Sequence, residues 1–226
     1  MPRPFEAEFS DGAGWEVHLN NIKSDHANLL LDYARAYRRV AHQVFEAVGE
    51  DFCRGKMHSD MDAYPIVFLY RRAVEAYLKT IIVFGNCLRC ARGQSAELPN
   101  KIFSMHGLED LLQSVRGTLC QPHCSLIWIP PIFQTFADAE RVIKAVDGID
   151  HDALRYPVRF RDDQVQALLP DGLSFNVHRF TEKMDLLLDL LDNAATRTWD
   201  AFQFEGLSHP NVTAEIIKEW LRDGCH

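Results

Sequence analysis

The sequence has no long apolar run and no excess of basic residues. Charged side chains interrupt its apolar stretches before about 18 residues, the length that a membrane-spanning helix needs. The N-terminal stretch MPRPFEAEFSDGAGWEV also lacks the apolar region of a secretion signal. We therefore expect a cytoplasmic protein with no membrane partner. The formal net charge of −8 excludes a general basic surface for nucleic acid, so any contact with phosphate must be local, through clustered arginines.

The sequence also has no internal repeat and no low-complexity segment. Its 226 residues, 47% hydrophobic and 25% charged, have an ordinary globular composition that excludes disorder throughout. Six cysteines in a chain without a secretion signal are expected to be reduced thiols and not a disulfide framework.

Apolar residues recur at helical spacing in five segments. A serine cap and a glycine stop mark the ends of the first segment, and a proline lies in the first turn of the second. Before the last segment, DHDALRYPVRFRDDQVQALLPDGLSF has β-like residues, two prolines and a glycine, which predicts an irregular excursion or a small hairpin. The predicted helices span residues 24–48, 65–84 or beyond, 106–117, 133–146 and 176–198.

These helices predict an all-α fold, a bundle of four to five helices in one domain at residues 24–198. Residues 1–23 are expected to form an N-terminal extension. Residues 199–226 are expected to form a C-terminal tail with a short helix, capped by Asn211 or Thr213 and ending near Leu221.

The most apolar helix carries four charges. The stretch FLYRRAVEAYLKTIIVF contains Arg71, Arg72, Glu75 and Lys79, which share one arc of about 100° on a helix. In one interpretation this stripe faces solvent, and Glu75 forms pairs worth about 0.2–0.5 kcal/mol each. In the other, the stripe lies in a polar groove between helices, where Glu75 orients basic side chains that bind phosphate or transfer protons. Other polar residues should then converge on it.

Two places along the chain offer such partners. His106 lies at the start of a helix after a loop, and Arg155 and Tyr156 lie in the excursion before a proline. Taken singly, a helix cap explains the histidine and a packed turn explains the Arg-Tyr pair. Neither is convincing alone.

Four motifs occur in a recognisable order: YPIVFLYRRAVEAYLKTI, HGLEDLL, LRYPV and NVHRFTEKMDLLLDLL. Together they resemble a widespread group of uncharacterised bacterial proteins related to the HEPN superfamily, over about residues 64–191. The resemblance implies a helical bundle, often dimeric. It also implies a superfamily rich in metal-independent ribonucleases of toxin–antitoxin and antiviral systems, beside members that only bind nucleotides or partner proteins.

The resemblance also implies which residues form a site. Any catalysis would be attack of a ribose 2′-hydroxyl on the adjacent phosphate, with no metal or cofactor. A histidine would move the proton, arginines would stabilise the negative charge on phosphorus, and a glutamate would hold the cations in place. The positions expected to be catalytic are Arg71, Glu75, Lys79, His106, Arg155 and Tyr156, with Arg72 as a binding residue.

One departure from the family pattern affects this expectation. The ribonuclease members carry Arg-x(4–6)-His near the start of the last long helix, whereas residues 178–179 of this chain read His-Arg. Residues 35–42 and 116–123 do match the motif, but two such matches are expected by chance. A non-catalytic module of the same fold that binds a nucleotide or a partner protein is therefore the alternative function.

A second candidate surface lies on the first helix. Arg35, Arg38, Arg39 and His42 fall on one helical face and form a basic stripe. It is either a second RNA-contacting surface, to which Arg35, Arg39 and His42 contribute, or a solvated face.

The cysteines have two interpretations. Cys87, Cys90, Cys120, His123 and Cys124 together offer four thiolates and an imidazole, the ligands that tetrahedral zinc takes. The pattern is compatible with a structural zinc site or with unligated cysteines. Redox chemistry is disfavoured because no βαβ pattern surrounds CLRC.

Overall fold

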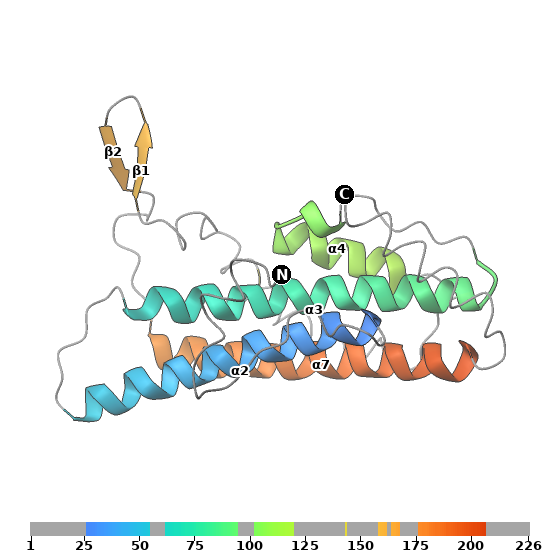
Figure 1. Ribbon diagram of the computed structural model, residues 1–226, viewed down its shortest axis with the longest axis horizontal. Helices are drawn as coiled ribbons and strands as arrows, with labels where there is room; N and C mark the ends of the chain where they lie inside the picture. Colours follow the sequence, from blue (N-terminus) through green and yellow to red (C-terminus); the bar gives the residue numbers. More distant parts are fainter. Residues whose placement is uncertain are drawn as a thin grey trace, which may run out of the picture.

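Figure 1 shows the computed structural model of the protein, in which long helices run alongside one another. The structure describes residues 26–54, 62–94, 102–119, 143, 158–161, 164–167 and 176–206. Its elements are α2 (His26–Cys53), α3 (Ala63–Ala91), the 3-10 helix η2 (Ile102–Ser104), α4 (Leu108–Leu119), β1 (Val158–Arg161), β2 (Gln164–Ala167) and α7 (Val177–Gly206). The predicted all-α bundle is thus confirmed.

Helix α3 is the centre of the bundle. It contacts α2, α4 and α7, and apolar side chains from all round its circumference are buried. This explains why its sequence is far more apolar than that of a one-faced helix. Within the described ranges, no helix has an apolar stretch that would cross a membrane.

The end of α3 is fixed by backbone hydrogen bonds. Gly93 has a φ of 70°, a left-handed conformation that glycine adopts without a steric penalty. The amide of Gln94 donates to the Arg89 carbonyl at 3.0 Å, and the amide of Gly93 donates to the Cys90 carbonyl at 2.9 Å. This is a Schellman motif, and it turns the chain out of α3.

Helix α7 is longer than the sequence analysis predicted. Asn176 caps its start, because its Oδ1 accepts a hydrogen bond from the Arg179 amide at 2.9 Å. The predicted end at Thr198 is wrong, since the helix runs to Gly206. The aromatic residues Trp199 and Phe202 continue its apolar face and lie in the core.

The excursion before α7 contains the predicted hairpin. Strands β1 and β2 pair antiparallel, with Val158 opposite Ala167 and Arg161 opposite Gln164. Except for residue 143, the helix predicted at 133–146 lies outside the described residues, as do the extension at 1–23 and the short helix of the tail.

Candidate functional site

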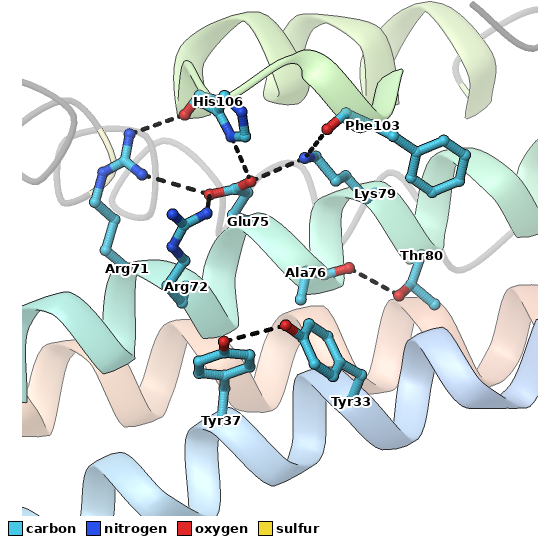
Figure 2. A network of polar contacts seen from close by, with 10 residues as sticks. All are labelled: Tyr33, Tyr37, Arg71, Arg72, Glu75, Ala76, Lys79, Thr80, Phe103 and His106. Carbon is cyan, nitrogen blue, oxygen red and sulfur yellow. Dashed lines mark hydrogen bonds and ion pairs between the residues drawn. The ribbon is translucent and has the colours of Figure 1, made fainter. Parts of the chain in front are cut away.

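The charged stripe of α3 is buried. Glu75 is 4% exposed, and Arg71 and Lys79 are 3% and 8% exposed. Burial excludes the solvent-facing interpretation. The stripe faces the segment that joins η2 to α4, as Figure 2 shows. We call Arg71, Arg72, Glu75, Lys79 and His106 the Glu75 cluster.

The Glu75 carboxylate accepts hydrogen bonds on both oxygens. Its Oε1 lies 2.8 Å from Lys79 Nζ and 3.0 Å from His106 Nδ1. Its Oε2 accepts from Arg72 Nη1 at 3.0 Å and from Arg71 Nη1 at the longer distance of 3.5 Å. One carboxylate thus holds four basic side chains in place.

Two members of the cluster also bind backbone carbonyls. Arg71 Nη2 donates to the His106 carbonyl at 2.8 Å, and Lys79 Nζ donates to the Phe103 carbonyl at 3.1 Å. These bonds attach the segment around η2 to α3. Arg71 and Lys79 therefore fix the position of His106, and they are positioning residues in this arrangement.

The other two basic residues are closer to solvent. The His106 side chain is 43% exposed and that of Arg72 is 16% exposed. The Arg72 guanidinium lies over the Phe68 ring, 5.3 Å from its centroid, a cation–π contact that restrains it. His106 and Arg72 are the members of the cluster that a ligand can contact first.

The cluster carries more positive than negative charge. Burial alone would raise the pKa of Glu75, but hydrogen bonds from Lys79 and His106, with the charges of Lys79 and Arg72, lower it overall. Glu75 is therefore ionised at neutral pH. Among the described residues, Arg71, Arg72 and Lys79 thus pair with this one carboxylate. The partly exposed Arg72 guanidinium suits an anionic ligand such as phosphate.

The ionised carboxylate also determines the tautomer of His106. A carboxylate only accepts hydrogen bonds, so Nδ1 of His106 carries the proton and donates it to Glu75. In the neutral imidazole, Nε2 then has the basic lone pair. A carboxylate that orients an imidazole in this way is a common arrangement for general acid–base chemistry.

A second charged region lies between α2 and α7. The α2–α7 seam consists of Arg35, Arg38, Arg39 and His42 from α2 and of Asp185, Asp189 and Asp192 from α7. Most of these residues line a groove of about 420 Å³, which Tyr77 of α3 also lines.

Most basic residues of the seam are paired with carboxylates. Arg35 donates to both oxygens of Asp192, at 2.7 and 3.2 Å. Arg38 Nη2 lies 2.7 Å from Asp189 Oδ1, and His42 Nδ1 lies 3.5 Å from Asp185 Oδ2. Arg35, Arg38 and His42 thus face the three aspartates, so most of the predicted basic stripe pairs with acidic residues of another helix.

The seam also reaches α3 through two tyrosines. The Tyr77 hydroxyl donates to Asp192 at 2.9 Å, and the Tyr70 hydroxyl donates to Asp185 at 3.2 Å. Burial and the neighbouring aspartates raise the pKa of both phenols. The sequence analysis missed the aspartates, although their spacing of four and three residues on α7 resembles that of the basic residues on α2.

Several predicted residues lie outside the described part of the chain. These are Arg155 and Tyr156 of the candidate site and Cys120, His123 and Cys124 of the candidate zinc ligands.

The other two candidate zinc ligands lie near the end of α3. Cys87 is buried and Cys90 is partly buried. Burial raises the pKa of the Cys87 thiol to about 12. Among the described residues, no group of three or more histidine, cysteine, aspartate or glutamate side chains is placed to hold a metal ion.

Comparison of the chain with protein-family models, with curated proteins and with solved structures found no match. The HEPN-like assignment therefore stays a prediction from the four sequence motifs.

Proposed function

We propose that this is an HEPN-like helical protein that binds RNA at the Glu75 cluster and cleaves it without a metal ion, in a bacterial defence or toxin-type system. The observation that supports the proposal is the partly exposed His106 imidazole, hydrogen-bonded at 3.0 Å to a buried carboxylate that also binds Arg72. A homodimer and a partner protein of such a system belong to the same proposal, on the family resemblance alone.

The reaction that these groups suit is transfer of the phosphate to the ribose 2′-oxygen. Nε2 of His106 takes the proton from the 2′-hydroxyl, whose oxygen attacks the adjacent phosphorus. The bond from phosphorus to the 5′-oxygen breaks, and that oxygen takes a proton from solvent. The products are a 2′,3′-cyclic phosphate and a 5′-hydroxyl. Arg72 stabilises the negative charge on the phosphate oxygens during attack.

A second candidate function is a non-catalytic module that binds a nucleotide or a partner protein. Two observations favour it. Arg71 and Lys79 donate hydrogen bonds to the backbone carbonyls of His106 and Phe103, as residues of a structural network do. The cluster also holds one imidazole among the described residues, so it offers a base but no second imidazole to protonate the leaving oxygen faster than solvent does.

Incubation of the purified protein with total RNA in EDTA tests the first function. We expect cleavage by the wild-type protein, and we expect His106→Ala to slow it at least 100-fold, since general acid–base groups contribute about 10²–10⁴ in rate. His178→Ala, which removes an exposed histidine of α7, is the matched control and should keep full activity.

RNA binding separates the two functions. The non-catalytic module would be favoured if the wild-type protein binds RNA but does not cleave it. In that case Arg72→Ala should weaken RNA binding, whereas Arg197→Ala, on the exposed face of α7, should leave it unchanged. Cleavage that survives His106→Ala, or wild-type protein that neither binds nor cleaves RNA, would contradict the first function.

A further inference from the structure

An exposed aromatic ring lies next to the Glu75 cluster. Tyr33 of α2 is 56% exposed, although most large apolar side chains of the described helices are buried. Figure 2 shows Tyr33 and Tyr37 on the α2 side of the cluster, with their hydroxyl groups directed toward α3. In the same view, the Arg72 side chain lies between Glu75 and the two tyrosine hydroxyls, and the positive charge of Arg72 lowers the pKa of Tyr33 while the charge of Glu75 raises it.

Tyr37 holds the Tyr33 ring in place. The two hydroxyl oxygens lie 3.1 Å apart within hydrogen-bond distance. The rings also meet edge to face, with centroids 4.8 Å apart and planes at 82°. Tyr37 in turn packs against the hydrophobic core. The Tyr33 ring is therefore preorganised while more than half of the residue stays in water.

Tyr33 carries no charge at physiological pH. The hydrogen bond with Tyr37, together with burial and the charge of Tyr37, raises the pKa of Tyr33 to about 12. The neutral ring does not repel a phosphate bound at Arg72, and its face can accept a flat apolar group. A nucleobase is such a group, and an aromatic side chain next to a cationic phosphate site is a common feature of single-strand recognition.

We propose that Tyr33 is a base-stacking platform of the Glu75 cluster, so that the ligand is single-stranded RNA with a phosphate at Arg72 and His106 and a neighbouring base on the Tyr33 ring. This inference rests on the proposed function and adds the form of the substrate. In duplex RNA the bases are stacked on one another and cannot reach the ring. The acidic net charge of −8 also disfavours the broad backbone contact that duplex binding needs.

Fluorescence anisotropy with 2′-O-methyl oligonucleotides tests the proposal, because these probes lack the attacking hydroxyl and so report binding alone. We expect wild-type protein to bind a mixed-sequence single strand more tightly than its duplex or an abasic strand of equal length. Tyr33→Ala should weaken binding of the single strand about tenfold or more, the loss expected for one stacked base. It should leave binding of the abasic strand unchanged.

Two further variants separate stacking from folding. Tyr33→Phe keeps the ring and should bind the single strand as the wild type does, which excludes a general effect of substitution. Phe204→Ala removes an exposed aromatic side chain of α7 and should have no effect.

Salt dependence separates stacking from charge. For single strands, the slope of log K against log salt changes by about 0.7 for each phosphate that a protein neutralises. Tyr33→Ala should keep the wild-type slope, whereas Arg72→Ala should reduce it by about that amount.

If Arg72→Ala and His106→Ala weaken binding while Tyr33→Ala binds the single strand as the wild type does, the stacking role of Tyr33 is wrong and the proposed function stands. The stacking role would also be wrong if Tyr33→Ala keeps RNA binding but changes the molecular mass measured by light scattering. That result would assign the ring to an interface between copies of the protein. Wild-type protein that binds none of the oligonucleotides would overturn the inference and the proposed function together.

Discussion

The Glu75 cluster and the α2–α7 seam contain the same kinds of side chain in two different environments. In the cluster, the Glu75 side chain is 5% exposed and pairs with the three cations Arg71, Arg72 and Lys79. In the seam, Arg35 is 46% exposed and Asp192 is 28% exposed, and arginines and aspartates are equal in number. Buried charge needs a reason, because its desolvation is unfavourable, whereas exposed charge needs none.

The two regions also differ in what they hold together. Seam residues join the side chains of one long helix to those of another. In the cluster, Arg71 and Lys79 instead bind the backbone of the η2 segment and so fix the place of His106. We infer that the cluster determines local geometry at a site, while the seam contributes to the alignment of two helices.

Removal of the cluster's carboxylate is the strongest test of this difference. Glu75→Leu should lower the free energy of unfolding by about 3–5 kcal/mol, because it leaves buried cations without their counterion. Urea denaturation followed by circular dichroism measures the change. Glu182→Leu, at an exposed position of α7, is the control and should change stability by less than about 0.5 kcal/mol. A loss under 1 kcal/mol for Glu75→Leu would mean that the cluster behaves as a surface pair.

Loss of one cation should have a smaller effect. Lys79→Met keeps the apolar stem and removes the charge, so the hydrogen bonds to Glu75 and Phe103 are lost while an unfavourable desolvation disappears. We expect a loss of about 2 kcal/mol. Faster amide hydrogen exchange is expected in residues 102–107, which the lysine attaches to α3. Lys183→Met on the exposed face of α7 should affect neither, and unchanged exchange in Lys79→Met would refute the positioning role.

The dependence of stability on pH should show the same contrast. The pKa of Glu75 lies below its ordinary value of 4.5. A carboxylate with a lowered pKa adds stability above its ordinary value and loses it as the pH falls through the folded value. The free energy of unfolding of the wild type should therefore fall below about pH 5 more steeply than that of Glu75→Leu.

Asp192 provides the comparison within the seam. Its pKa is also lowered, because hydrogen bonds from Arg35 and Tyr77 outweigh the opposing effect of burial. The sign is the same, but solvent screens this more exposed pair. Asp192→Asn should thus change the acid dependence less than Glu75→Leu does. If Asp192→Asn and Glu75→Leu change the acid dependence of the free energy of unfolding equally, the cluster and the seam do not differ in this respect.

The sequence predicted these two regions to different extents. For the cluster, helical angles placed the four charges on one stripe, and the family resemblance supplied His106. The bonds from Arg71 and Lys79 to backbone carbonyls were not predictable, because they depend on how the segment before α4 folds back onto α3. For the seam, the pairing of Arg35 with Asp192 depends on the relative register of two helices far apart in the chain, and local periodicity contains no such information.

Helix ends were also predicted unequally. The start of α7 has a clear signal, because Asn176 is a strong capping residue. Its end has none near Thr198, where Trp199 and Phe202 continue the apolar face. Trp199 packs on Phe84 of α3, with ring centroids 4.7 Å apart. That tertiary contact extends the helix beyond the point where its composition becomes more polar.

The smallest expected effect is at the seam, and it sharpens the comparison most directly. A double-mutant cycle with Arg35→Ala and Asp192→Ala should give a coupling energy of about 0.2–1 kcal/mol at low salt, as for other solvent-exposed pairs. It should decrease as salt is raised, because ions screen exposed charges. The matched cycle with Lys79→Met and Glu75→Leu should give a larger coupling that salt changes little, since both groups are buried. If the seam coupling instead equals that of the cluster and resists salt, the two regions are energetically alike, and burial would no longer single out the Glu75 cluster as the candidate site.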